Sequence, residues 1–202
     1  DSFHAGHAFF MLNGTTSAVQ TMVLSVARAN EKIILPRNVH RSVIYALILT
    51  GAIPVYVNPD VHPKYGIPLG MKLSNVAKEI LENPDAKAIF VKNPTYYGIC
   101  SNLKGIVDLA HKHGMQVCVD EAHGTHFYFK SGLPISAMDA GADMAAVSMH
   151  KTGGSLTQSS ILLIKDKKRL GEIRQVINLT QTTSGSYLLL SSLDITRKFL
   201  AL

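Results

Sequence analysis

Cysteine is scarce in this chain of 202 residues, which contains only Cys100 and Cys118. The two lie far apart and have neither the spacing of metal ligands nor that of a redox pair. We therefore predict two reduced thiols, a cytoplasmic location and no metal site. Long apolar runs are also missing, because a glycine and a proline interrupt the most apolar region, residues 43–57. A membrane span needs about 20 apolar residues, so we predict no membrane association.

A strong charge of one sign is missing as well. The chain has 20 Lys and Arg against 14 Asp and Glu, a net charge of +6, and its one dense basic run, residues 165–169, includes an acid. No nucleic-acid-binding motif accompanies this charge, so we predict no nucleic-acid partner. The chain begins with Asp1 and has no secretory leader at that point. We expect it to be a piece of a longer protein.

Strand-like and helix-like segments alternate along the whole chain. The expected strands are residues 7–12, 32–35, 54–57, 88–91, 116–119, 143–147 and 160–164, and the expected helices are residues 18–29, 41–50, 74–81, 102–113, 134–140, 166–178 and a last one from 187. This alternation predicts an α/β sheet with helices on both faces. The segment 148–159 is too short for a parallel crossover, so the last strand should return antiparallel and the sheet should be mixed.

The segment 146–160 carries Lys151 between two apolar runs and among glycine and hydroxyl-bearing residues. A lysine amine reacts with carbonyl groups when a desolvated site keeps it neutral, and small neighbours leave room for a flat cofactor. The alternative interpretation is a glycine-rich surface loop with an ordinary lysine.

Polar groups follow several expected strands, where open α/β sheets bind their ligands. They are Gly14–Ser17, His40, Asp120 and the segment that ends at Lys151. Gly14–Ser17 opens a helix and suits a phosphate, although on its own such a turn is more often plain helix capping. Walker and Gly-x-Gly-x-x-Gly fingerprints do not occur in the sequence.

Three further side chains have two interpretations each. Asp120 is either a structural carboxylate or the anion that keeps a pyridine nitrogen protonated. His40 is either satisfied locally at a helix start or part of a site, and the same choice holds for His123.

The surroundings of Lys151 resemble the lysine signature of the Orn/Lys/Arg decarboxylases, which use pyridoxal phosphate (PLP). The matching residues are Ser148, His150, Lys151, Thr157, Gln158 and Ser159, and further matches are Asn13–Ser17, Arg37–His40, Asn93–Tyr96, Asp120–His123 and Gln181–Ser184. The resemblance covers essentially the whole chain. It implies a three-layer sandwich with a mostly parallel, seven-stranded mixed sheet, the large domain of PLP-dependent transferases with the aspartate-aminotransferase-like fold. Residues 1–202 would form this PLP-binding domain, without the family's N-terminal segment and C-terminal small domain.

The resemblance also implies roles for individual residues. Lys151 would bond covalently to PLP, Asp120 would pair with the pyridine nitrogen, and His40 would stack on the ring. Thr16, Ser17, Ser148 and His150 would surround the phosphate, and Thr183 and Ser184 would reach the phosphate of a partner subunit. His123, where some relatives carry tryptophan, would lie near the cofactor or substrate. The implied assembly is a homodimer or a higher homo-oligomer with the active site at the interface.

The implied reaction is the decarboxylation of a basic amino acid, arginine, lysine or ornithine, to its amine and CO₂. Such an enzyme belongs to amino acid metabolism and polyamine biosynthesis. One alternative is another PLP reaction on this fold, such as aminotransfer or carbon–sulfur cleavage. A second is a non-catalytic cofactor-binding fragment. The sequence leaves the choice among the three basic amino acids open.

Overall fold

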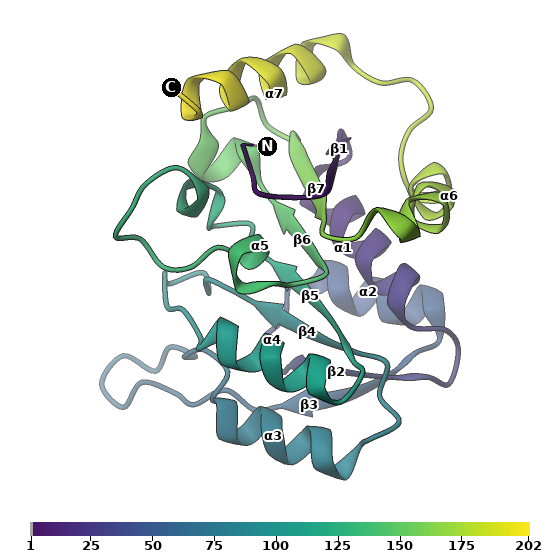
Figure 1. Ribbon diagram of the computed structural model, residues 1–202, viewed down its shortest axis with the longest axis vertical. Helices are drawn as coiled ribbons and strands as arrows, with labels where there is room; N and C mark the ends of the chain where they lie inside the picture. The colour runs from purple at the N-terminus through teal and green to yellow at the C-terminus, as the bar shows by residue number, and fades with distance from the viewer. Residues whose placement is uncertain (1) are drawn as a thin grey trace.

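A computed structural model describes residues 2–202 and arranges them in three layers around one seven-stranded sheet (Figure 1). The strands are β1 (His7–Met11), β2 (Lys32–Pro36), β3 (Ile53–Val57), β4 (Ala88–Lys92), β5 (Gln116–Asp120), β6 (Met144–Val147) and β7 (Ser160–Ile164). Their order in the sheet is β1-β7-β6-β5-β4-β2-β3. The predicted three-layer α/β fold with a mixed sheet is confirmed.

Strand direction follows from the lengths of the connections. Strands β3, β2, β4, β5 and β6 pair in parallel, each joined to the next along the chain by a segment long enough to cross over a face of the sheet. β7 runs antiparallel to β6 and to β1, as the short connection after β6 predicts. The inner residues of β5 and all residues of β6 are apolar, because both faces of these central strands are covered by helices.

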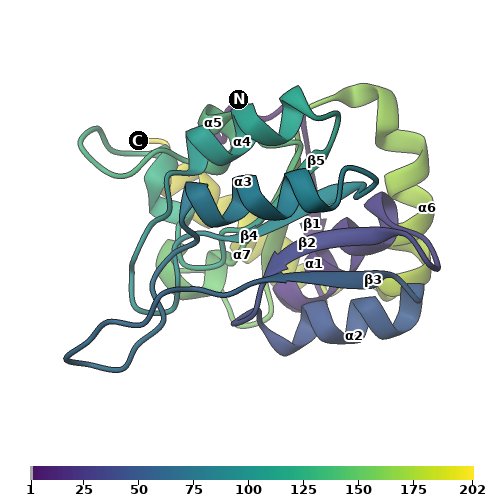
Figure 2. The ribbon, with the colours of Figure 1, turned by 90° about the horizontal axis from the view of Figure 1, so that it is seen from below.

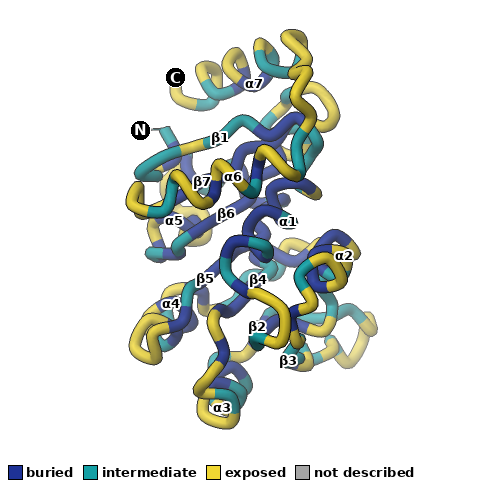
Figure 3. The backbone as a smooth tube through the Cα atoms, turned by 90° about the vertical axis from the view of Figure 1, so that its right-hand side faces the viewer, coloured by how far each residue is buried: buried dark blue, intermediate teal, exposed yellow. Residues whose placement is uncertain are grey.

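Helices cover both faces of the sheet (Figure 2). One face carries α1 (Gly14–Val26), α2 (Arg41–Thr50) and α6 (Leu170–Thr180), and the other carries α3 (Leu73–Glu82), α4 (Leu103–Lys112) and α5 (Ala137–Ala140). The last helix, α7 (Tyr187–Leu200), lies beyond the β1–β7 edge of the sheet (Figure 1). Two clusters of buried apolar side chains fill the spaces between the layers, and the outer faces of the helices remain exposed (Figure 3).

Several predicted element boundaries were wrong. α1 begins at Gly14 rather than residue 18, because the Gly14 N–H donates to the Gln158 carbonyl (3.0 Å) and the chain enters the helix directly after the turn. It ends at Val26 because Ala27 is extended. The helix predicted for residues 134–140 spans only Ala137–Ala140, since the Ser136 hydroxyl caps it.

Three short helical turns were not predicted. They are η1 (Thr125–Tyr128), η2 (Met149–Gly153, a π-helical turn) and η3 (Lys167–Arg169). The helix expected from residue 166 is divided into η3, which Asp166 caps, and α6. Between residues 2 and 202, the helices are too short or too polar to cross a bilayer.

Candidate active site

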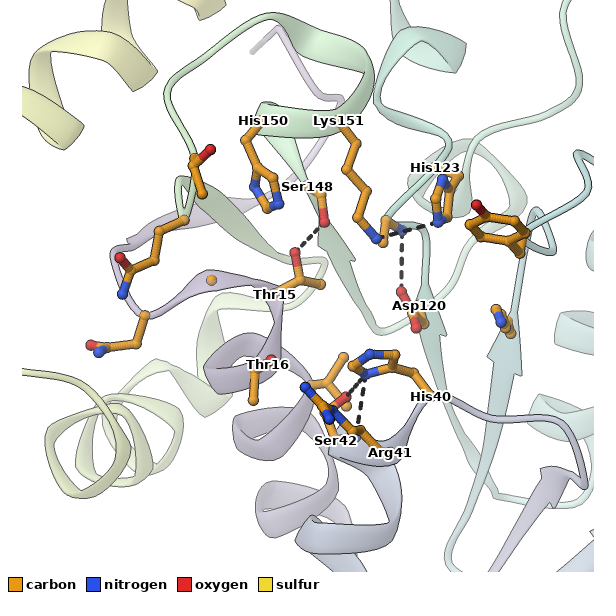
Figure 4. Close-up of a pocket in the computed structure, with 18 residues that line it drawn as sticks. Thr15, Thr16, His40, Arg41, Ser42, Asp120, His123, Ser148, His150 and Lys151 are labelled. Atoms are coloured by element: carbon orange, nitrogen blue, oxygen red, sulfur yellow. Dashed lines mark hydrogen bonds between the residues drawn. The ribbon is translucent and has the colours of Figure 1, made fainter.

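A cavity of about 600 Å³ lies at the carboxyl ends of the parallel strands, on the face that carries α1 and α2 (Figure 4). It is lined by Asn13, Gly14, Thr15, Thr16, Val19, His40, Arg41, Ser42, Lys92, Tyr96, Asp120, Ala122, His123, Ser148, His150, Lys151, Thr157 and Gln158. The turn into α1, the start of α2, the ends of β4 and β5, and the segment between β6 and β7 therefore meet at one place. This is where open α/β sheets bind ligands.

Lys151 projects into the cavity from η2, which turns the chain immediately after β6 (Figure 4). Its Nζ lies 3.3 Å from Nε2 of His123. Desolvation lowers the pKa of the Lys151 amine, the charge of Asp120 opposes this shift, and the charge of Lys92 adds to it. A lysine with a lowered pKa is more often neutral, the form that attacks a carbonyl carbon.

Asp120 is the last residue of β5 and is buried, with 5% of its surface exposed. The Ala122 N–H donates to its Oδ1 (3.2 Å). The strand register sets Asp120 between Lys92 of β4 and Ala146 of β6. The carboxylate therefore has a fixed position in the wall of the cavity.

His40 caps the N-terminus of α2, where its Nδ1 accepts a hydrogen bond from the Ser42 N–H (3.2 Å). A ring nitrogen that accepts carries no hydrogen, so the hydrogen of the neutral ring is on Nε2. Desolvation lowers the pKa of His40, Asp120 raises it, and the nearby cations lower it further. The net lowering of its pKa favours the neutral form of the His40 ring in the cavity.

His123 lies on the turn that follows β5. Besides its contact with Lys151, its ring meets the Tyr96 ring edge to face, with the ring centroids 5.5 Å apart. Desolvation lowers the pKa of His123, and the charge of Lys151 lowers it further. These effects favour the neutral imidazole beside the lysine amine, and the charge of Asp120 opposes them by raising the pKa of His123.

A cluster of hydroxyl groups forms the wall opposite His123. The Thr15 hydroxyl is hydrogen-bonded to those of Ser148 and Ser160, at 2.9 Å for Ser160, and the Ser160 hydroxyl donates to the Val147 carbonyl (2.7 Å). The uncharged first turn of α1 adds its backbone N–H groups and the positive end of the helix dipole. Thr16 lies in the same turn. Such a wall suits an anionic oxygen group.

The sequence profile of the Orn/Lys/Arg decarboxylase major domain matches residues 1–201. The chain belongs to the Orn/Lys/Arg decarboxylase family. It is 51% identical over 205 residues to the arginine decarboxylase of Halalkalibacterium halodurans and 48% identical over 205 residues to that of Bacillus subtilis (strain 168). In both comparisons the match covers 100% of this chain and 41% of the relative, so the chain spans about two fifths of their length.

Solved structures of this decarboxylase family have the same fold. Lysine decarboxylase A from Pseudomonas aeruginosa superimposes with a TM-score of 0.90 at 25% identity, over 100% of this chain and 30% of that chain. The serine palmitoyltransferase of Sphingomonas wittichii has a TM-score of 0.78 at 19% identity, over 99% of this chain and 48% of that chain. At that identity the second likeness concerns the fold alone.

The structure brings most of the predicted site residues of this family member together. Those that line the cavity are Thr16, His40, Asp120, His123, Ser148, His150 and Lys151. Ser17 lies outside the lining, because it is buried and its hydroxyl donates to the Gly14 carbonyl (3.0 Å). Thr183 and Ser184 also lie outside it, exposed on the segment between α6 and α7.

Sequence reasoning missed two charged residues that line the cavity, Arg41 and Lys92. Thr15 belongs to the predicted turn Gly14–Ser17, although no individual role was predicted for it. Lys92 is the residue that ends β4, at the same edge of the sheet as Asp120. A strand-by-strand search for polar terminal residues would have found it. Arg41 directly follows His40, but nothing in the sequence distinguishes it from any polar residue in the first turn of a helix such as α2.

Proposed function

We propose that this chain forms the PLP-binding domain of a decarboxylase that converts a basic amino acid to its amine and CO₂. The observation that carries the proposal is the placement of Lys151, an amine with a lowered pKa, in one cavity with the buried carboxylate of Asp120. Relatives about 50% identical are named arginine decarboxylases, which favours arginine among the three basic amino acids.

The residues of the cavity fit PLP in chemical type. A lysine amine can bond to its aldehyde, a carboxylate can pair with its pyridine nitrogen, and a neutral imidazole can lie on its ring. Hydroxyl groups and the N-terminus of α1 can bind its phosphate. When bound, PLP supplies the electron sink that makes loss of CO₂ from an amino acid feasible.

The side chains of this chain would each have a defined task. Lys151 would hold the cofactor and give it up to the amine of the substrate. Asp120 would keep a proton on the pyridine nitrogen, and His40 would exclude water from one face of the ring. Thr16, Ser148 and His150 would orient the phosphate. Ser17, hydrogen-bonded to Gly14, would support this wall from behind.

Reductive trapping tests the cofactor part of the proposal. We expect the full-length protein, incubated with PLP, reduced with borohydride and digested, to carry a phosphopyridoxyl group on Lys151. The label should disappear in Lys151→Ala and persist in Lys165→Ala, a matched lysine outside the cavity. Mass spectrometry of the peptides measures both. Label spread equally over surface lysines would contradict the assignment.

Product analysis of the same protein tests the reaction. We expect CO₂ and the corresponding amine from arginine, lysine or ornithine. Transamination without CO₂ release would indicate an aminotransferase on the same fold, and a labelled Lys151 without turnover would indicate a cofactor-binding module. The expected place in amino acid metabolism and polyamine biosynthesis depends on this result. A reducing, cytoplasmic location agrees with the two free thiols, of which Cys118 is buried with a raised pKa, and cell fractionation tests it.

We also propose that the protein is a homodimer or a higher homo-oligomer. Thr183 and Ser184 are exposed outside the cavity of their own chain, which suits residues that reach the phosphate of a partner. The adjoining helix α7 exposes apolar side chains, among them Leu188 at 76%. Large exposed apolar patches often mark interfaces.

Sedimentation velocity tests the assembly. We expect the full-length protein to sediment as a dimer or larger, and Leu188→Asp to shift it toward monomer because a carboxylate would be desolvated in the interface. Leu81→Asp, on the 70%-exposed Leu81 of α3, is the matched control and should sediment like the wild type. A wild-type protein that is monomeric at every concentration would refute the proposal.

A further inference from the structure

His150 is held in one tautomer by a backbone carbonyl. Its Nδ1 lies 2.9 Å from the carbonyl oxygen of Ser159. A carbonyl oxygen only accepts, so Nδ1 must carry the hydrogen. In the neutral ring, the other nitrogen, Nε2, therefore has a lone pair and no hydrogen.

The carbonyl that sets this tautomer is itself fixed. Ser159 is fully buried, its N–H donates to the Leu156 carbonyl (3.2 Å), and its hydroxyl donates to the same oxygen. The next residue, Ser160, begins β7 and is hydrogen-bonded to Val147 of β6. These bonds hold the chain on both sides of the Ser159 carbonyl, so the tautomer of His150 is set by the segment between the two strands.

His40, across the same cavity, has the opposite arrangement. Its Nδ1 accepts from the Ser42 N–H, so its neutral ring offers an N–H at Nε2. Neutral His150 offers only a lone pair at Nε2. It lines the cavity together with the hydroxyl groups of Thr16 and Ser148, in the wall suited to an anionic oxygen group. A dianion placed there would meet a lone pair, which repels it.

We infer that anion binding at this wall of the cavity, formed by Thr16, Ser148 and His150, is linked to proton uptake. A dianion binds there together with a second proton on the His150 ring, and the resulting imidazolium donates a hydrogen bond from Nε2. This inference rests on the proposed function, because the anion in question is the phosphate of the cofactor. It adds that loading the site takes up a proton and becomes weaker as pH rises.

Other charged groups lie near enough to take part and must be separated from His150. The cavity also contains Arg41, Lys92, Asp120, Lys151 and the rings of His40 and His123. The elements packed against η2 include β7, whose residues do not titrate, η1 and α7. η1 contributes His126 and Tyr128. α7 contributes Tyr187, Asp194, Arg197 and Lys198, and Asp194 and Arg197 pair with each other (2.7 Å).

Sulfate is the probe that isolates the protein's proton, because it stays a dianion through the neutral range whereas a phosphate ester titrates there. We would titrate sulfate into the full-length protein by calorimetry, in two buffers of different ionisation enthalpy, at several values from pH 6.5 to 8.5. The expected result is uptake of up to one proton per sulfate. Sulfate affinity should fall as pH rises, by up to about tenfold per pH unit where one proton is taken up per sulfate.

Two variants assign the proton. His150→Gln keeps an N–H donor that does not titrate, so proton uptake should be lost and the pH dependence should flatten. His40→Asn removes the other histidine on a helix start and should keep the uptake. Equal uptake by wild type and His150→Gln would overturn the inference, as would loss of uptake in His40→Asn alone.

The labelling of Lys151 separates this inference from the proposed function. A labelled Lys151 together with pH-independent sulfate binding would refute the proton linkage and leave the cofactor site intact. An unlabelled Lys151 together with no sulfate binding would refute both.

Discussion

Replacement of Asp120 by asparagine should lower kcat for decarboxylation by about 10²–10³, the usual cost of removing one preorganised electrostatic group from an active site. Asparagine has the same shape and can still accept the hydrogen bond from the Ala122 N–H, so the cavity should keep its form. In the proposed site, asparagine could not hold a proton on the pyridine nitrogen of the cofactor. The measurement is CO₂ release by the full-length protein at a saturating concentration of the amino acid.

The same variant should still be labelled at Lys151, because the proposed covalent bond to the cofactor would not need the carboxylate. Since the charge of Asp120 raises the pKa of Lys151, its removal should lower that pKa, and labelling should persist to more acidic pH. Asp108→Asn is the control, because Asp108 is an exposed carboxylate of α4 paired with Lys104. Unchanged kcat in Asp120→Asn, or equal losses in both variants, would show that Asp120 is structural.

Much of this site could be predicted because its residues follow a rule of position. Asp120 ends the buried strand β5, Lys151 lies in the turn that follows the buried strand β6, and parallel strands present their carboxyl ends at one edge. Periodicity also predicted every strand of the sheet, and the short connection before β7 predicted its direction. These properties are local in the sequence, which is why they could be read without coordinates.

The interactions that complete the site are not local. Thr15 and Ser160 are hydrogen-bonded across 145 positions of sequence, and their pairing depends on the sheet order that sets β7 beside β6. His150 lies in a π-helical turn for which the sequence has no simple pattern, and its tautomer depends on the carbonyl of Ser159, nine residues away and just before β7. Ser17 is an example of what local position alone does not show. It belongs to the turn predicted to bind a phosphate, but in helix α1 its side chain is buried and donates to the Gly14 carbonyl.

Glu121, next to Asp120, faces the opposite way and is fully buried. The Tyr128 hydroxyl donates to its Oε2 and the Ala137 N–H donates to its Oε1 (2.8 Å). These two bonds link Glu121 to the middle and to the far end of the segment 121–137, which carries His123. Desolvation raises the pKa of Glu121 from 4.5 to about 8, and the two hydrogen bonds only partly oppose the shift. The folded protein thus contains a protonated carboxyl group at neutral pH.

This carboxyl group should make folding stability fall as pH rises from about 4.5 to about 8. In that window the folded protein binds a proton at Glu121 that the unfolded chain has lost, so the free energy of unfolding decreases with pH. One pKa unit corresponds to about 1.4 kcal/mol, so the loss amounts to a few kcal/mol and levels off above pH 8. Glu121→Gln cannot ionise and should be more stable than the wild type at pH 8.5 by that amount.

Urea unfolding at pH 5 and pH 8.5 measures the effect. Glutamine keeps an acceptor for the Ala137 N–H and offers its own N–H to the Tyr128 hydroxyl, so at pH 5 the variant should unfold much like the wild type. Glu82→Gln, at an exposed position of α3, controls for the loss of one negative charge and should follow the wild type at both pH values. If Glu121→Gln instead loses stability in parallel with the wild type, Glu121 does not bind the extra proton, and the destabilisation at high pH must come from another buried group.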